Sequence, residues 1–99
     1  MFTHVVFFWL KPGTSEAARQ QTIDGCKEYL ARIPGVRHLW AGKPAMTPRD
    51  VVDNSYQVGL CVVFDDRAAH DLYQEHPLHK EFIEKNKMHW QRVQVYDFA

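Results

Sequence analysis

A tyrosine and two histidines beside a proline make Leu72–Phe82 the segment most capable of chemistry (Leu-Tyr-Gln-Glu-His-Pro-Leu-His-Lys-Glu-Phe). The residue before a proline is disfavoured in helical conformation, so a helix arriving from the N-terminal side should end at His76. Pro77 suits the first position of a second helix, because its missing N–H would have no partner there. Tyr73 then lies in the last turn of one helix and His79 in the first turn of the next, and the bend can direct both side chains at one point.

Tyr73 and His79 have the side chains that acid–base chemistry on a carbonyl compound requires. An aldol ring closure needs a base that removes a proton next to a carbonyl and a donor that polarises the carbonyl oxygen. A histidine with an ordinary pKa of about 6.5 suits the first task, and the first turn of a helix favours its neutral form. The Tyr73 hydroxyl is the donor or orients the imidazole. The alternative is structural, with the pair sealing the helix–sheet interface by hydrogen-bonding to each other.

The other histidines predict less. We expect His76 to be a helix N-cap or a hinge residue, and His4 to be either a pocket wall or a buried histidine at a strand edge. The residue types would allow zinc to bind between His70, Glu75, His76 and His79, but the helix break disturbs their spacing. We therefore expect no metal site. The glycines are scattered and form no phosphate-binding loop, so we also expect no cofactor.

Length and composition predict a single globular domain over residues 1–99, with 45% hydrophobic and 24% charged residues. Twelve basic residues balance 12 acidic ones, which argues against nucleic acid or an anionic membrane as a partner. The longest apolar run, Val5–Leu10, is far shorter than the roughly 20 residues that span a bilayer, and we see no signal peptide. Cys26 and Cys61 are isolated and lack the spacing of a metal site. We therefore expect both to be buried free thiols in a reducing compartment, the cytoplasm.

Hydrophobic periodicity and turn residues predict the order β-α-β-β-α-β, with the second helix broken in two. Strands are predicted at Thr3–Lys11, Val36–Gly42, Tyr56–Phe64 and Arg92–Phe98. Helices are predicted from Thr14 or Ser15 to about Arg32, over Arg67–Glu75, and from Pro77 to about Met88. This order is typical of an α+β, ferredoxin-like fold, in which helices cover one face of a four-stranded antiparallel sheet.

The first strand is apolar on both faces, since His4, Val6, Phe8 and Leu10 alternate with Val5, Phe7 and Trp9. Helices would cover only one of these faces, and the other would leave a large apolar patch in water. The sequence therefore predicts a homodimer that packs sheet against sheet. At the end of the first helix, unpaired carbonyls around Leu30, Ile33 and Val36 could hold a cation, the alternative being ordinary capping or water.

Short motifs in a fixed order along the whole chain resemble the stress-responsive A/B barrel (Dabb) family, within the dimeric α+β barrel superfamily. They are His4-Val5-Val6, Lys11-Pro12-Gly13, Ile33-Pro34-Gly35, Tyr56, Phe64, Tyr73, His76-Pro77-Leu78-His79 and Val95-Tyr96-Asp97-Phe98. The resemblance implies a ferredoxin-like protomer and a homodimer whose two sheets form a barrel.

The family includes plant stress proteins and polyketide cyclases that close a ring by aldol chemistry. Similarity to those cyclases implies that Tyr73 and His79 are the acid–base pair and that His4 lines the pocket. A small apolar or polyketide-like molecule would bind between sheet and helices, against His4, Val6, Phe8, Ile23, Cys26, Leu39 and His76. A non-catalytic stress-response or structural dimer and a cofactor-free monooxygenase remain alternatives, so the sequence leaves open whether the chain is an enzyme.

Overall fold

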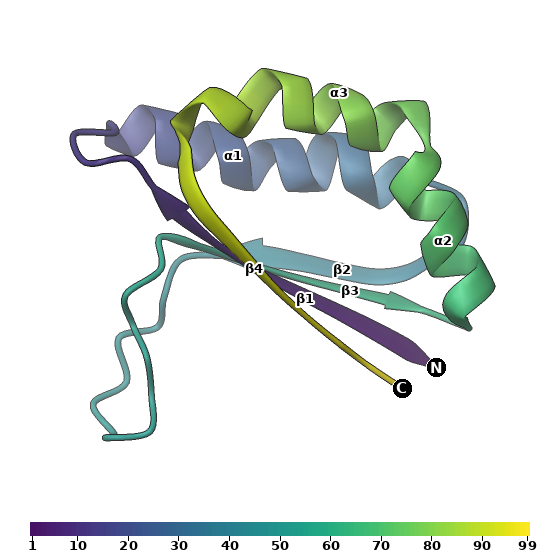
Figure 1. Ribbon diagram of the computed structural model, residues 1–99, viewed down its shortest axis with the longest axis horizontal. Coiled ribbons are helices and arrows are strands. Elements are labelled where there is room, and N and C mark those ends of the chain that lie inside the picture. Colours follow the sequence, from purple (N-terminus) through teal and green to yellow (C-terminus); the bar gives the residue numbers. More distant parts are fainter.

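The computed structural model describes residues 1–99 as one sheet covered by helices on one face (Figure 1). The strands are β1 (Phe2–Leu10), β2 (Val36–Gly42), β3 (Val58–Phe64) and β4 (Trp90–Phe98). The helices are α1 (Glu16–Tyr29), α2 (Arg67–Glu75) and α3 (Pro77–Asn86), and 3₁₀ turns follow α1 at Leu30–Arg32 and α3 at Lys87–His89. The four strands are antiparallel in the order β2-β3-β1-β4. The predicted ferredoxin-like α+β fold is confirmed.

Most predicted boundaries hold to within one to three residues. β3 begins at Val58 rather than at Tyr56, and β4 begins at Trp90 rather than at Arg92, a difference of two residues in each case. The Tyr56 ring, just before β3, packs on Phe7 with centroids 4.7 Å apart. Both long helices end earlier than predicted, because their last residues tighten into 3₁₀ turns that leave fewer carbonyls unpaired.

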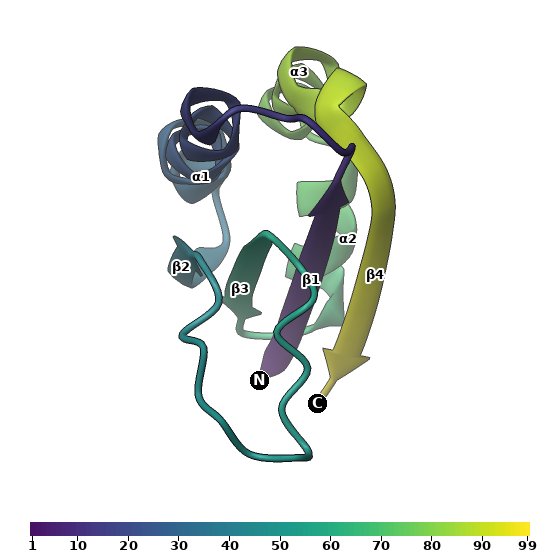
Figure 2. The ribbon, with the colours of Figure 1, turned by 90° about the vertical axis from the view of Figure 1, so that its left-hand side faces the viewer.

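Side-chain caps fix where the helices start. The Ser15 hydroxyl accepts from the Ala18 N–H, and the Asp66 carboxylate accepts from the Ala69 N–H. His76 does the same for α3: its Nδ1 accepts from the Leu78 N–H, and its extended backbone (φ −67°, ψ 141°) separates α2 from α3. The predicted break at His76, with its N-cap role, is confirmed. α2 therefore turns away from the line of α3 and reaches down beside the sheet (Figure 2).

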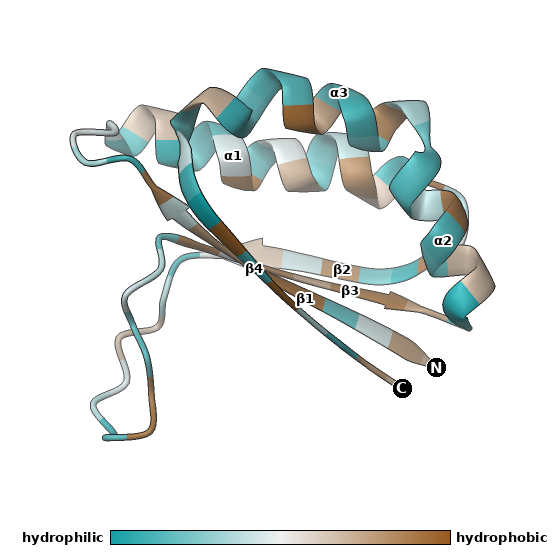
Figure 3. Cartoon of the chain, viewed as in Figure 1, coloured by the Kyte–Doolittle hydropathy of each residue, from teal (hydrophilic) through white to brown (hydrophobic).

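The core lies between the helices and one face of the sheet, the covered face. Alternate residues of β1 and β3 are buried there, as are one stripe of α1 and the aromatic residues of α2 and α3. The most deeply buried of these side chains are Cys26, Leu30, Val58, Val62, Phe64 and Tyr73. Hydrophobic colour runs along β3, whereas the outer turns of α2 and α3 are largely hydrophilic (Figure 3).

The opposite face of the sheet, the open face, has no helix over it. Its apolar side chains include Val5, Phe7, Trp9, Trp40, Tyr56, Tyr96 and Phe98, of which Trp40 is 73% exposed and Phe98 is 61% exposed. The predicted irregular segment between β2 and β3 leaves the sheet on this side, away from the helices (Figure 1). None of the helices is both long enough and apolar enough to cross a bilayer.

Candidate functional site

A cavity of about 190 Å³ lies on the covered face, between the β1–β4 half of the sheet and helices α2 and α3. Ten of its 13 lining residues are hydrophobic. The side chains with polar groups on its wall are those of His4, Tyr73, Gln74, His79 and Trp90. Val93 and Val95 of the edge strand β4 also line it and are 42% and 41% exposed, so the cavity opens beside this strand.

Tyr73 and His79 meet on this wall, as the bend at His76 predicts. Their rings pack edge to face with centroids 5.0 Å apart, and no hydrogen bond joins them. The Tyr73–His79 hydrogen bond that the structural alternative requires is therefore not formed. Nδ1 of His79 is buried without any partner, which leaves Nε2 as the nitrogen able to exchange a proton with a ligand.

Burial sets the protonation state of both groups. It is the main cause that lowers the pKa of His79 below its ordinary value, and the charge on His4 lowers it further, although Glu75 opposes the shift. Burial raises the pKa of the Tyr73 phenol well above its ordinary value. At neutral pH the imidazole is then a neutral base, and the phenol remains a hydrogen-bond donor.

His4 also lines the cavity and is held by a carboxylate from β4. The β1–β4 register puts His4 opposite Asp97, and Nδ1 of His4 lies 2.6 Å from Oδ1 of Asp97. A carboxylate can only accept, so this nitrogen carries the proton and Nε2 keeps the lone pair. Burial lowers the pKa of His4, while the Asp97 bond opposes that shift. The Tyr73 ring centroid lies 5.9 Å from that of His4 and 5.0 Å from that of His79, so Tyr73 contacts both imidazoles.

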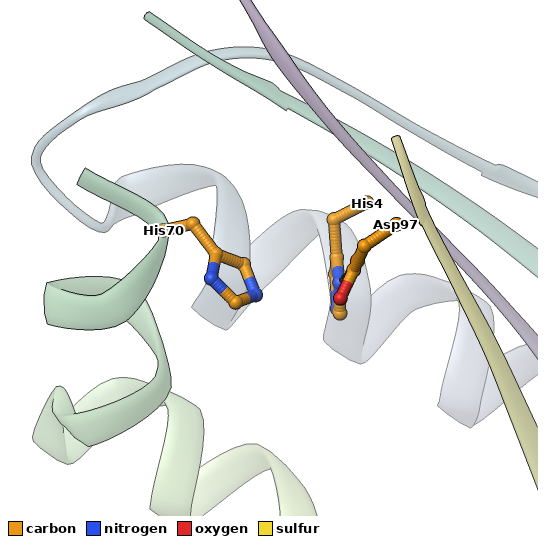
Figure 4. Close-up of side chains that lie close together, drawn as sticks. All are labelled: His4, His70 and Asp97. Atoms are coloured by element: carbon orange, nitrogen blue, oxygen red, sulfur yellow. Dashed lines mark hydrogen bonds and ion pairs between the residues drawn. The ribbon is translucent and has the colours of Figure 1, made fainter. Parts of the chain in front are cut away.

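His70 also lies beside His4. It comes from α2, one helical turn before Tyr73, and its ring centroid is 5.0 Å from that of His4 (Figure 4). The ring stacks on Phe2 at 4.5 Å, and its side chain is 12% exposed. His4 therefore contacts Tyr73 of the acid–base pair as well as His70.

Three of the seven predicted ligand-binding residues, His4, Val6 and Phe8, line the cavity. Ile23 and Cys26 instead lie in the closed part of the core, where burial raises the pKa of Cys26 to about 12. Leu39 is on β2, at the other edge of the sheet, and His76 is used as the cap of α3. These four residues do not line the cavity, because α3 rather than α1 forms its helical wall.

The residues first considered for zinc and for a backbone cation are arranged differently. His76 is committed to capping, and the His70, Glu75, His76 and His79 set does not come together as a group of ligands. The carbonyls of Leu30 and Ile33 accept backbone N–H groups at 3.2 and 3.3 Å, which is ordinary capping of the helix end. The ligand-bearing side chains that do come together are His4, His70 and Asp97.

The sequence did not indicate Asp97, Gln74 or Trp90 as site residues, and it placed His70 only in a zinc set with Glu75, His76 and His79. A signal existed for Asp97, since pairing the first and last strands end to end puts the chain's last carboxylate opposite its first histidine. A signal also existed for His70, three residues before Tyr73 and therefore on the same side of the helix. Trp90 and Gln74 carry no such pattern.

Comparisons with solved structures support the fold. The chain is 24% identical to a Dabb family protein with a ferredoxin-like fold from Mesorhizobium loti (TM-score 0.79, covering 99% of this chain and 94% of that one). It is 17% identical to a dimeric ferredoxin-like protein from Thermobifida fusca (TM-score 0.83, 99% and 89% covered). It is 18% identical to a hydroxynitrile lyase from Passiflora edulis (TM-score 0.81, 98% and 90% covered). A comparison with curated protein sequences finds no match.

The match to a protein family is more decisive, because it extends over nearly the whole chain. Residues 2–99 match the family described as the stress responsive A/B barrel domain. The predicted resemblance to this family is thereby confirmed. The chain belongs to the stress-responsive A/B barrel (Dabb) domain family.

Proposed function

We propose that the protein is a homodimeric enzyme that binds a small, largely apolar carbonyl compound in the cavity and performs aldol-type acid–base chemistry on it. His79 is the general base and Tyr73 is the donor to the carbonyl oxygen. The observation that carries this proposal is the Tyr73–His79 pair on an apolar wall, with ring centroids 5.0 Å apart and His79 Nδ1 buried without a partner.

The two side chains divide the proton transfers. Nε2 of neutral His79 takes a proton from the carbon next to the carbonyl, and the Tyr73 O–H donates a hydrogen bond to the carbonyl oxygen as negative charge develops there. The resulting enolate carbon forms a bond to a second carbonyl carbon. The new alkoxide then takes the proton from His79, which returns to its neutral form. The reverse sequence breaks the same carbon–carbon bond.

Two polar atoms of residues that line the cavity have no hydrogen-bond partner. They are Trp90 Nε1 and His79 Nδ1, and both are buried. A buried polar group without a partner costs about 1–3 kcal/mol, so such groups are uncommon. Because both atoms are closed to solvent, a ligand could pair with them only after these side chains move, and Nε2 of His79 is the atom available for proton exchange.

The cavity volume favours a small substrate. About 190 Å³ is less than the roughly 300–1,000 Å³ of sites for drug-sized ligands. A longer, polyketide-like chain would have to extend past the exposed Val93 and Val95 at the opening. The name of the Passiflora edulis relative describes a lyase of hydroxynitriles, which supports testing small substrates as well as polyketides.

The open face supports the homodimer. Phe7 and Trp9 of β1 and the exposed Trp40 would form a contiguous apolar surface unusual for a monomer. Packing two sheets against each other covers this surface, and the segment between β2 and β3 projects on the side where the partner would lie. The relative from Thermobifida fusca is described as dimeric. Cys26 and Cys61 are both free, which supports a reducing compartment such as the cytoplasm.

Turnover of small β-keto thioesters, polyketides and hydroxynitriles tests the acid–base roles. We expect wild type to convert at least one class, and we expect His79→Ala and Tyr73→Phe each to lower kcat by about 10²–10⁴-fold. Tyr73→Phe keeps the ring that packs on Phe64, and circular dichroism shows whether each variant folds. His38→Ala, which removes an exposed imidazole on β2, is the matched control.

Two results would contradict the proposal. Turnover that survives both substitutions would remove Tyr73 and His79 from the reaction. Binding of these compounds without any conversion would favour the alternative, a non-catalytic dimer that binds small molecules.

A further inference from the structure

Three side chains far apart in the sequence form a compact group of metal-ligating atoms at the rim of the covered face. His4, His70 and Asp97 each offer a ligand atom, and these atoms all lie within 4.8 Å of one another. They come from β1, α2 and β4, and they point toward one another (Figure 4). A group assembled from three separate elements depends on the tertiary fold.

The fold holds two of the three residues firmly. His4 is 4% exposed and is paired in register with Asp97 across the β1–β4 ladder, with Nδ1 and Oδ1 2.6 Å apart. His70 approaches from the helix above, where stacking on Phe2 with centroids 4.5 Å apart restricts its ring. Nδ1 of His4 and Oδ1 of Asp97 share a proton in their hydrogen bond, so a metal ion would either displace that proton or bind through Nε2 of His4 and the other oxygen of Asp97.

The ligand set is one that zinc sites share with non-haem Fe²⁺ sites. Two imidazoles and one carboxylate are the donors of three-ligand zinc sites, in which water or a substrate completes a tetrahedron. With bonds of about 2.0–2.1 Å, tetrahedral ligand atoms lie roughly 3.3 Å apart. Compared with the present 4.8 Å limit, the widest separation would have to shrink by no more than about 1.5 Å. Small rotations of His70 and Asp97 can supply this.

A carboxylate behind His70 prepares its other nitrogen for a metal. Oδ1 of Asp71 lies 3.0 Å from Nδ1 of His70, and because a carboxylate only accepts, Nδ1 carries the proton. Nε2 therefore has the free lone pair, which accepts from the Gln74 amide at 3.2 Å. A carboxylate on the second nitrogen is the usual companion of a metal-ligating histidine. A metal ion would replace the Gln74 amide at Nε2.

Charge and access also favour a cation. Asp97 contributes one negative charge and its side chain is 38% exposed, so an ion can enter from solvent past this carboxylate. The two imidazoles behind it are nearly buried, since the side chain of His4 is 6% exposed and that of His70 is 12% exposed. From these observations we propose that His4, His70 and Asp97 bind one Zn²⁺ per chain.

This site is distinct from the proposed acid–base pair. Neither His79 nor Tyr73 is among the three ligand residues. A Zn²⁺ ion bound here would share only His4 with the cavity wall. Metal binding can therefore be measured without any substrate, and its failure would leave the roles of Tyr73 and His79 untouched.

Calorimetric titration of the tag-free, chelator-treated full chain with Zn²⁺ at neutral pH tests the proposal. We expect one Zn²⁺ per chain, and we expect His70→Ala and Asp97→Asn each to weaken binding by more than about tenfold. Asp71→Asn, which leaves all three ligands in place, should weaken it by about 10–100-fold as a second-sphere change. His38→Ala, an exposed histidine outside the group, should leave the affinity unchanged.

Titration with Co²⁺ gives an independent spectroscopic readout, since low-coordinate Co²⁺ with nitrogen and oxygen ligands absorbs visible light. The band should appear in wild type and in His38→Ala and should be lost in His70→Ala. No Zn²⁺ binding at micromolar protein would overturn the proposal, as would affinity unchanged in both His70→Ala and Asp97→Asn. Equal weakening by His38→Ala would overturn it as well, because it would indicate scattered surface binding.

Discussion

The two faces of the sheet differ in chemistry although the same strand contributes to both. On the covered face, β1 presents His4, Val6 and Phe8 to the core and the cavity, next to Tyr73 and His79. On the open face, the same strand presents Val5, Phe7 and Trp9, which meet the aromatic rings of Tyr56 and Tyr96. All three site residues with shifted pKa values lie on the covered face.

This difference shows how one strand can contribute to a reactive site on one face of the sheet and to an association surface on the other. Side chains of β1 that differ by one position face opposite sides of the sheet, so reactive groups and an association surface coexist within nine residues. A substitution on one face should therefore disturb one task and largely spare the other.

Phe7→Asp should abolish the homodimer. In the proposed sheet-to-sheet packing this substitution buries two carboxylates per dimer against apolar partners, and each uncompensated buried charge costs several kcal/mol. Light scattering at micromolar protein should give the mass of two chains for wild type and of one chain for the variant. Leu72→Asp on the outside of α2, where the side chain is 73% exposed, should leave the dimer intact. A dimeric Phe7→Asp variant would contradict the assigned surface.

Phe64→Ala should lower the free energy of unfolding by about 3–5 kcal/mol, because it leaves a cavity in the tightest part of the covered face. Phe64 is fully buried and packs against Tyr73 with ring centroids 5.0 Å apart. Val95→Ala at the cavity opening, 41% exposed, should lower it by about 1 kcal/mol or less. Urea denaturation at one protein concentration measures both. An equal loss of unfolding free energy in the two variants would show that the cavity opening at Val95 is packed as tightly as the core around Phe64.

The two cysteines report on the two faces separately. Burial raises the pKa of Cys26 on the covered face to about 12, which makes its thiolate at pH 8 about a thousandfold scarcer than that of an ordinary cysteine. Iodoacetamide should therefore modify Cys26 only after denaturation. Half-buried Cys61 on the open face should be protected in the dimer and modified in Phe7→Asp, as mass spectrometry can show. Rapid modification of Cys26 in the folded protein would contradict the closed core.

The fold could be predicted from the sequence because its signals are local. Alternating apolar residues mark the strands, and Pro34-Gly35 and His76-Pro77 mark where helices end. The cap at His76 involves only a neighbour two residues away. Because the bend is also local, the meeting of Tyr73 and His79 followed from the sequence as well.

The rest of the site depends on contacts between distant segments. Asp97 reaches His4 across 93 positions, and only the β1–β4 register brings them together. Ile23 and Cys26 belong to the apolar stripe of α1. The sequence pattern of this stripe is the same whether it faces a cavity or a filled core. The close approach of α3 decides between these: a Cβ added at Gly25 would lie 3.2 Å from Phe82, whose side chain lines the cavity in place of α1. No local pattern encodes that spacing.

The smallest expected effect is a loss of stability in acid that arises from the covered face. His4 and His79 both have a pKa below the ordinary value, mainly through burial, although Asp97 and Glu75 oppose the shifts. Below about pH 6.5 the unfolded chain therefore binds more protons than the folded chain, and the free energy of unfolding falls as pH falls. Above that pH both residues are neutral in both states and contribute no pH dependence. Thermal melting between about pH 8 and about pH 5 measures this.

Two variants assign the acid sensitivity to the covered face. His79→Asn removes one of the two responsible groups, so its melting temperature should fall less steeply with acidification than that of wild type. His38→Asn, at an exposed position on the other side of the sheet, should keep the wild-type slope. Repeating the series in Phe7→Asp removes any contribution from dissociation of the proposed dimer. A slope that vanished in Phe7→Asp but persisted in His79→Asn would move the pH dependence to the open face, and the two faces would then not be independent.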